Sequence, residues 1–117
     1  MSELRFPKIN SIMLSGRATR DAEIKTLANG TLNAKISMAF DRSYKKGNEW
    51  VNETSYIDVI AWSKLAENSG VIRKGDPLII EGYLQVRDWK DNQNISHKQP
   101  EIIASRIHQL LKSETTP

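Results

Sequence analysis

Aromatic and basic side chains occur together at several positions along this chain of 117 residues. Tyr56, Trp62 and Trp89 each lie where an alternating pattern would point them toward water, and each has a basic residue close by. Tyr44 belongs to residues 42–46, a stretch with one arginine and two lysines. Solvated rings cost free energy, so such a row requires a partner. Aromatic faces stack on flat molecules and basic side chains attract anions, which predicts a flat, negatively charged partner.

The alternation is clear in residues 56–62. Alternate residues of a β-strand point to opposite faces, and positions 57, 59 and 61 are all apolar. The other face carries Asp58 together with Tyr56, Ile60 and Trp62. Because an unpaired carboxylate is rarely buried, we expect this second face, with its two rings, to meet solvent.

Two further segments alternate in the same way. Residues 78–89 place Leu84 and Val86 in an apolar file and Arg87 and Trp89 in the opposite, polar file. Gly82 interrupts the apolar file in mid-strand, which often marks the sharp bend of a small barrel. Residues 32–41 are apolar at alternate positions and point four polar side chains outward, namely Asn33, Lys35, Ser37 and Asp41. Three half-buried strands indicate an antiparallel all-β domain.

Turn and capping signals divide much of the remaining chain into elements. Asn29-Gly30 and Gly47 predict two tight hairpins, because these residues tolerate positive φ. Ser63 is interpreted as the N-cap of a short helix that stops at Gly75. The predicted strands cover residues 9–17, 32–42, 50–62 and 78–89.

The C-terminal part is less regular. Residues 90–99 are polar and predict a mobile loop. Within residues 101–112, isoleucine and leucine at positions 103, 107, 110 and 111 fit a helical stripe, whereas the isoleucine pair at 102 and 103 fits a strand that enters the sheet. We favour a strand at the start of this element.

Length and composition limit the class of protein. A chain of 117 residues suits one compact domain, which we place at residues 1–112, followed by a short tail at 113–117. The net charge of +3 suits a polyanionic partner. The absence of cysteine excludes disulfides and thiolate zinc sites. The apolar stretch at residues 9–14 is too short for a signal peptide or a membrane span, so we expect a soluble, cytoplasmic protein.

The residues do not indicate catalysis. His97 and His108 lack the spacing of a metal site and have no accompanying nucleophile motif, and no glycine-rich phosphate loop is present. A pair formed by Asp58 and Glu81 across the sheet, without a pocket, is more typical of hydrogen-bonded surface than of an active site. We therefore expect no enzymatic activity, no cofactor and no metal.

The predicted order of three strands, one helix and further strands is that of the OB fold, a small barrel that binds oligonucleotides or oligosaccharides. We expect an all-β protein, a five-stranded OB-fold Greek-key barrel with one short helix between strands 3 and 4. Four segments, in order and with the right gaps, resemble the bacterial single-stranded DNA-binding protein family: GRATRDAE at 16–23, NG at 29–30, IDVIAWSKLAE at 57–67 and KGDPLIIEGYLQVRDW at 74–89. The resemblance runs from about residue 8 to residue 111.

The resemblance implies a protein that binds single-stranded DNA without strong sequence preference and protects it during replication, recombination and repair. It also implies a nucleoid-associated homotetramer whose subunits first pair through residues 9–16. The family's base-stacking positions fall on Tyr44, Tyr56, Trp62 and Trp89. Basic residues are candidates to neutralise the phosphates, namely Arg17, Arg20, Arg42, Lys45, Lys46, Lys64, Arg73, Arg87, Lys90 and Lys98.

The chain departs from the family pattern in three places. Ala22 stands where the family usually has proline, and Ser63 where it usually has glycine. Bacterial members typically continue to an acidic tip that recruits replication and repair enzymes, and residues 112–117 contain no such tip. The chain is either truncated or lacks this recruiting function, so these enzymes as partners stay open.

Packing offers an alternative role for several rings. Trp62 would instead pack under the helix that follows it, and Tyr56 against a side chain across the strands. Tyr44 and Trp50 would pair with each other across the turn at residues 45–48. The rings interpreted as structural are Phe6, Phe40 and Tyr83. The alternative function is an OB-fold adaptor that binds RNA or a replication or repair protein through the same aromatic residues.

Overall fold

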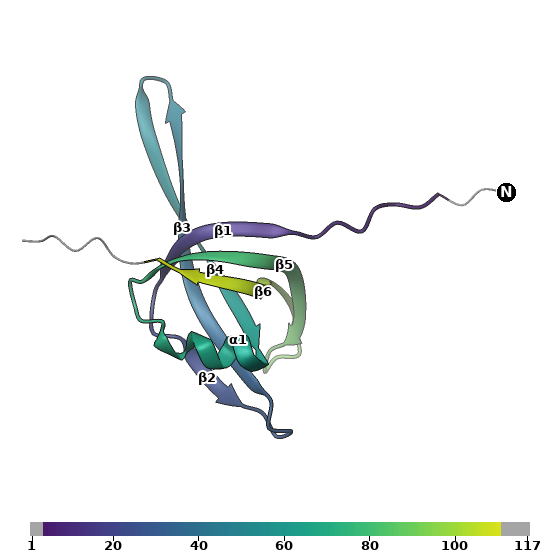
Figure 1. Ribbon diagram of the computed structural model, residues 1–117. Helices are drawn as coiled ribbons and strands as arrows, with labels where there is room; N and C mark the ends of the chain where they lie inside the picture. Colours follow the sequence, from purple (N-terminus) through teal and green to yellow (C-terminus); the bar gives the residue numbers. More distant parts are fainter. Residues whose placement is uncertain (1–3, 111–117) are drawn as a thin grey trace, which may run out of the picture.

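Five strands close into a small barrel in the computed structural model, which describes residues 4–110 (Figure 1). The barrel strands are β1 (Ile12–Ala18), β3 (Leu32–Lys46), β4 (Glu49–Trp62), β5 (Pro77–Lys90) and β6 (Ser96–Gln109). Neighbours pair in the order β1-β5-β6-β4-β3, and β1 pairs with β3 to close the barrel. The β4–β6 pairing is parallel and the others are antiparallel. The predicted five-stranded OB-fold barrel is confirmed.

Three smaller elements complete the fold. The short strand β2 (Glu23–Thr26) pairs with β3. Helix α1 (Ser63–Asn68) and the 3₁₀ turn η1 (Ser69–Val71) connect β4 to β5, so the helix lies between the third and fourth barrel strands as predicted. Among residues 4–110, no helix is long and apolar enough to cross a membrane. The predicted domain boundary at residue 112 lies outside the described residues.

The core confirms the alternation that predicted β3 and β4. Ala34, Ile36 and Met38 of β3 are fully buried, as are Val59 and Ala61 of β4. The other large side chains that are fully buried are Ile72, Leu78, Ile80 and Ile102. Burial of each large aliphatic side chain stabilises the fold by about 1.5–3 kcal/mol. The outer faces of the same strands are thereby left to polar and aromatic residues.

The apolar file of β5 is buried over only part of its predicted length. Leu84 and Val86 are 41% and 51% exposed, so the prediction that they face the core is wrong. The register of β5 with β6 shifts between Glu81 and Gly82, where a Cβ on Gly82 would collide with the carbonyl oxygen of Ile103. Gly82 therefore marks the predicted bend. Beyond it β5 pairs with β6 and no longer with β1, which leaves its apolar file without a core to enter.

Both predicted hairpin turns are present. Gly30 and Gly47 have φ values of 85° and 64°, in the left-handed region that favours glycine. The sequence predicted no strand between residues 17 and 32, the interval that contains β2. β2 has only four residues, and Ile24 is its single strongly apolar one, so its sequence is too short to show the alternation of a half-buried strand.

The C-terminal element is a strand, so the helical alternative for residues 101–110 is wrong. The predicted mobile loop at residues 90–99 is also wrong for half of its length, because β5 extends to Lys90 and β6 begins at Ser96. Asp91 organises the short turn between them. Its Oδ1 accepts hydrogen bonds from the backbone amides of Gln93 and Ile95, both at 2.9 Å. The polar composition of this stretch reflects an exposed hairpin.

The start of α1 differs from the prediction. Trp62, not Ser63, occupies the N-cap position, and no side chain caps the helix. Ser63 has a φ of 55°, a left-handed conformation that costs an L-residue about 1–2 kcal/mol. Glycine avoids this cost, which explains why a glycine suits the position. Ala66 of α1, and Ser69 and Ile72 just after it, are buried and attach this connection to the barrel.

The N-terminal segment extends away from the barrel before β1 begins at Ile12, three residues later than predicted (Figure 1). Asn10 attaches the segment to β5, since its side chain donates to and accepts from the backbone of Leu84, both at 2.8 Å. Phe6 is 77% exposed and Tyr83 is 44% exposed, so a role in packing is not supported for either ring, whereas Phe40 is half-buried.

Candidate nucleic-acid interface

Two of the predicted rings lie on the outer face of β4. Tyr56 is 73% exposed and Trp62 is 42% exposed, while Val59 and Ala61 between them are fully buried. Tyr56 lies opposite Ala39 on β3, whose methyl group covers little of the ring. Trp62 remains partly exposed next to α1, so it is not buried beneath the helix. Both rings therefore present surface to a partner.

Trp62 contributes to a groove lined by residues of five strands, β2, β3, β4, β5 and β6. The residues lining it are Lys25, Asn33, Lys35, Asp58, Ile60, Trp62, Gln85, Arg87 and Glu101. Lys35 Nζ lies 3.7 Å from Asp58 Oδ2, and Arg87 Nε lies 3.6 Å from Glu101 Oε2. Glu101 is 5% exposed, so its ion pair with Arg87 holds the guanidinium against the floor of the groove. Lys25 has no ion-pair partner within residues 4–110.

The two lysines of this groove are absent from the sequence-based set of phosphate ligands. The alternation of β3 had already placed Lys35 on the outer face, so the sequence could have identified it as a candidate phosphate ligand. Lys25 belongs to β2, the strand that the sequence did not reveal. The position of Lys25 therefore emerges only once β2 is paired with β3.

Tyr56 contributes to a second groove on the same side of β4. The residues lining it are Thr19, Arg20, Ser37, Met38, Tyr56, Ile57, Asp58, Gln99 and Pro100. Asp58 accepts hydrogen bonds from Ser37 Oγ at 3.3 Å and Gln99 Nε2 at 3.0 Å. Because Asp58 lines both grooves, they open onto one continuous surface.

The carboxylate pair considered from the sequence does not form. Asp58 binds Ser37 and Gln99, whereas Glu81 Oε2 lies 2.7 Å from His108 Nε2. Register pairs Asp58 with Glu101 instead, because β4 runs parallel to β6. Within residues 4–110, no group of three or more His, Cys, Asp and Glu side chains could hold a metal ion.

Trp89 stacks against a residue that the sequence did not indicate. Its ring centroid lies 4.5 Å from that of His97 at an interplanar angle of 19°. One face of the indole is therefore occupied, and the side chain remains 39% exposed. The neighbouring groove is lined by Asp88, Trp89, Lys90, Ser96 and Lys98. The register places Trp89 and His97 on one face of the hairpin and Lys90 and Lys98 on the other.

Asp91 holds the ring of His97 in place. His97 Nε2 lies 2.7 Å from Asp91 Oδ2. The hydrogen bond to His97, followed by those from the amides of Ile95 and Gln93, lowers the pKa of Asp91 below its ordinary value of 3.8. A lowered pKa means that the folded hairpin favours the carboxylate form of Asp91. The support beneath Trp89 is thus strongest when Asp91 is ionised.

Tyr44 lies on the β3–β4 hairpin, on the opposite face from Trp50. Register pairs Tyr44 with Val51 and Lys45 with Trp50, so the expectation that the two rings pair across the turn is wrong. Tyr44 Oη donates to Glu53 Oε1 at 3.0 Å. The guanidinium of Arg42 lies 4.5 Å from the Tyr44 ring centroid and covers one face of it.

Five further basic candidates lie elsewhere on the barrel, and three of them form ion pairs. Arg17 forms an ion pair with Asp41 at 3.1 Å, and Arg20 pairs with Glu23 at 3.6 Å. Lys98 pairs with Asp88 at 3.2 Å. Lys45 and Lys46 are exposed at the end of the hairpin. Each of these five residues lies on a strand or connection that also carries or adjoins a candidate ring.

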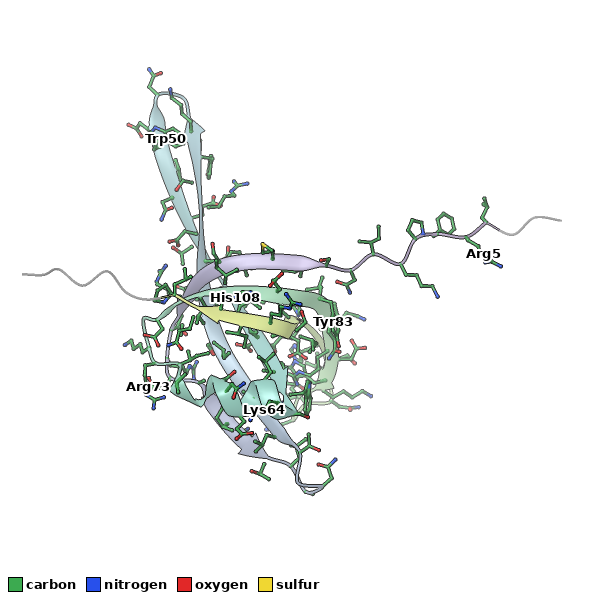
Figure 2. The ribbon with its side chains drawn as sticks, in the orientation of Figure 1. Arg5, Trp50, Lys64, Arg73, Tyr83 and His108 are labelled. Carbon is green, nitrogen blue, oxygen red and sulfur yellow. The ribbon has the colours of Figure 1, made fainter. Side chains whose placement is uncertain are left out.

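Lys64 and Arg73 are placed differently. Lys64 lies on α1 and pairs with Glu67 at 3.6 Å, and Arg73 lies in the connection that follows η1 (Figure 2). Arg73 Nη1 donates to the backbone carbonyl oxygens of Gly70 at 2.7 Å and Ile72 at 3.3 Å. Neither residue lines a groove that contains Tyr56, Trp62 or Trp89. The structure therefore does not bring these two into the candidate interface.

Three relatives are similar to this chain over most of its length. The relative from Chlorobaculum tepidum, named single-stranded DNA-binding protein 2, is 36% identical over 110 residues. Those from Borreliella burgdorferi and Treponema pallidum, named single-stranded DNA-binding protein, are each 35% identical, over 95 and 106 residues. The matches cover 92%, 80% and 90% of this chain, and 74%, 63% and 59% of the respective relatives. The chain thus spans less than two thirds of the latter two.

Solved structures agree on the fold. A structure of Plasmodium falciparum SSB in complex with single-stranded DNA is similar with a TM-score of 0.80 at 25% identity, covering 92% of this chain and 99% of that chain. A deletion mutant of the Thermus aquaticus single-stranded DNA binding protein has a TM-score of 0.79 at 20% identity, covering 88% and 51%. The model of the Single-strand binding protein family matches residues 9–110, and the chain therefore belongs to that family.

Proposed function

We propose that this protein binds single-stranded DNA without strong sequence preference, by stacking bases on Tyr56, Trp62, Trp89 and Tyr44. The observation that carries this proposal is the continuous outer surface of β4, where Tyr56 and Trp62 are exposed. Basic residues adjoin both rings, Arg20 at Tyr56 and Arg87 at Trp62. A stacking surface with cations beside it suits a chain of bases joined by phosphates.

Stacking explains both the tolerance of sequence and the preference for single strands. Every base has a π-face, so stacking on tryptophan or tyrosine accepts any base and is worth about 1–3 kcal/mol per base by alanine substitution. A duplex hides these faces between its own base pairs. Neutralisation of phosphates by the basic residues releases counterions, so the affinity falls as salt rises.

The proposed role of the whole protein is to protect single-stranded DNA during replication, recombination and repair in the bacterial cytoplasm. It does so as a homotetramer whose subunits pair through the N-terminal strand. One edge of β1 supports this assembly: β1 pairs with β5 along one side, and with β3 only at Arg17 and Ala18. Within the described residues, the second edge from Ile12 to Gly16 is unpaired and available to another copy of the chain.

Fluorescence titration tests the binding proposal. Oligo-dT should quench tryptophan emission at stoichiometric, salt-sensitive occupancy, and duplex DNA and RNA of the same length should bind more weakly. Equal affinity for all three would contradict the proposal. Stronger binding to RNA, or quenching by none of them, would instead favour an OB-fold adaptor for RNA or for a protein. Sedimentation at micromolar concentration tests the tetramer, and a mass of one subunit would contradict it.

A further inference from the structure

Trp50 is the most exposed of the three tryptophans and has no role in the site described above. Its side chain is 73% exposed, compared with 42% for Trp62 and 39% for Trp89. Figure 2 shows Trp50 on the β3–β4 hairpin, which projects from the barrel. A solvated indole of this size costs free energy, so a binding partner is required to explain it.

The register of the hairpin decides which face Trp50 occupies. The pairing of β3 with β4 is unbroken from Asn33 opposite Trp62 to Lys46 opposite Glu49. Without a bulge, residues an even number of positions apart on β4 stay on one face. Trp50, Tyr56 and Trp62 are spaced six residues apart, so all three lie on the same face of one strand. The strand's twist turns this face gradually without transferring a residue to the other side.

Charge separates the two faces of the hairpin. Glu49 and Glu53 share the parity of Val51 and therefore lie on the face of Tyr44, where Glu53 also contacts Arg42 at 3.7 Å. The Trp50 face carries Lys45 directly across from Trp50. In the described chain Lys45 has no ion-pair partner. The hairpin carboxylates other than Asp41 thus lie away from Trp50.

Asp41 shares the face of Trp50 but is already neutralised. Its Oδ2 lies 3.1 Å from Arg17 Nη1, and its Oδ1 accepts a hydrogen bond from Thr54 at 2.7 Å. The hydrogen bond from Thr54, followed by Arg17, lowers the pKa of Asp41. Between Tyr56 and Trp50 the face otherwise carries the neutral pair Ser43 and Asn52, whose side chains form a hydrogen bond from Ser43 Oγ to Asn52 Oδ1 at 2.9 Å. A phosphate backbone passing here meets no free carboxylate.

We propose that Trp50 is a further base-stacking residue that continues the DNA path from Trp62 and Tyr56 out along the β3–β4 hairpin, with Lys45 as its phosphate partner. The inference rests on the proposed function. At about 3.3 Å per residue, Trp50 lies about 20 Å from Tyr56 along the strand. Only a DNA segment long enough to span that interval contacts both rings. Tyr44 serves the opposite face, where Arg42 and Glu53 surround it.

A sole-tryptophan variant tests the contact directly. In W62F/W89F, Trp50 is the remaining tryptophan and the phenylalanines keep a ring at the other two positions. Oligo-dT should quench Trp50 emission in step with binding, which is followed separately by the anisotropy of labelled oligo-dT. Full binding with unchanged Trp50 emission would overturn the inference and leave the proposed function intact. Failure of the unmodified protein to bind oligo-dT would instead overturn the proposed function.

Affinity measurements on the otherwise unmodified chain give a second readout. W50A should weaken binding of oligo-dT at the upper end of OB-fold site sizes, about 16 nucleotides, by about 5- to 150-fold, and leave binding at the lower end, about 4 nucleotides, unchanged. W50F should retain most of the affinity, and V51A, on the other face, should retain all of it. Wild-type affinity of W50A for both lengths would overturn the inference. If its sedimentation mass also falls, Trp50 serves contacts between copies of this chain.

Discussion

Replacing Trp89 by alanine separates stacking from folding. Trp89 packs on His97 at a centroid distance of 4.5 Å and is otherwise at the surface. Loss of an aromatic pair lowers the free energy of unfolding by about 0.5–1.5 kcal/mol. This is small beside the roughly 10 kcal/mol typical of a domain. W89A should therefore remain folded while its binding to oligo-dT weakens by about 1–3 kcal/mol, or about 5- to 150-fold.

The salt dependence distinguishes this loss from loss of a charge. W89A leaves Lys90 and Lys98 in the groove, so the slope of log affinity against log salt should stay unchanged. K90A is the matched control: removal of one phosphate contact should reduce the slope by about 0.7 for a single strand. Anisotropy of labelled oligo-dT at several salt concentrations measures both. A folded W89A with wild-type affinity would refute the stacking role, and loss of its circular dichroism spectrum would show that Trp89 is required for folding.

Three further predictions concern stability. S63G should raise the free energy of unfolding by about 0.5–1 kcal/mol and Tm by about 2–4 °C. The substitution removes the cost of the left-handed conformation, about 1–2 kcal/mol, and the greater conformational freedom of glycine in the unfolded chain offsets part of this gain. An unchanged or lower Tm on thermal melting would contradict the prediction. G82A should destabilise by about 1–3 kcal/mol through collision with Ile103, measured by urea unfolding, and an unshifted midpoint would argue against the close approach. Asp91 has a lowered pKa, so its contribution to stability is present above its ordinary value of 3.8 and is lost as pH falls through the folded-state pKa. D91N should lose this component at neutral pH and flatten the acid limb, and a melting curve that follows wild type across pH would rule the contact out.

Much of the candidate site is predictable from local patterns. The parity of residues 56–62 is sufficient to place Tyr56 and Trp62 outward, because Val59 and Ala61 alternate with them and are apolar. The same parity extends to Trp50, whose role the sequence left open because nothing local showed that the strand continues without a bulge. The unbroken register with β3 supplies that information.

Other parts of the site depend on pairings between distant segments. His97 meets Trp89 because a turn of five residues brings β6 alongside β5, and composition alone suggested a mobile loop there. Lys25 joins Trp62 only through the pairing of β2 with β3. Arg73 and Lys64 looked equivalent to the other cations in sequence, but they lie on the connection that carries α1, and Arg73 is engaged with its own backbone.

Periodicity, turn residues and the family pattern determined the barrel class, its helix, its two tight hairpins and the outward side of β4, because each of these is a local property of neighbouring residues. The tertiary structure decided where β5 leaves the core, since the bend at Gly82 depends on the approach of Ile103 from β6. It also decided which cations meet which rings and that the one carboxylate on the Trp50 face of the hairpin, Asp41, is paired with Arg17. These features depend on the register between strands, and register is set by contacts between segments far apart in the chain.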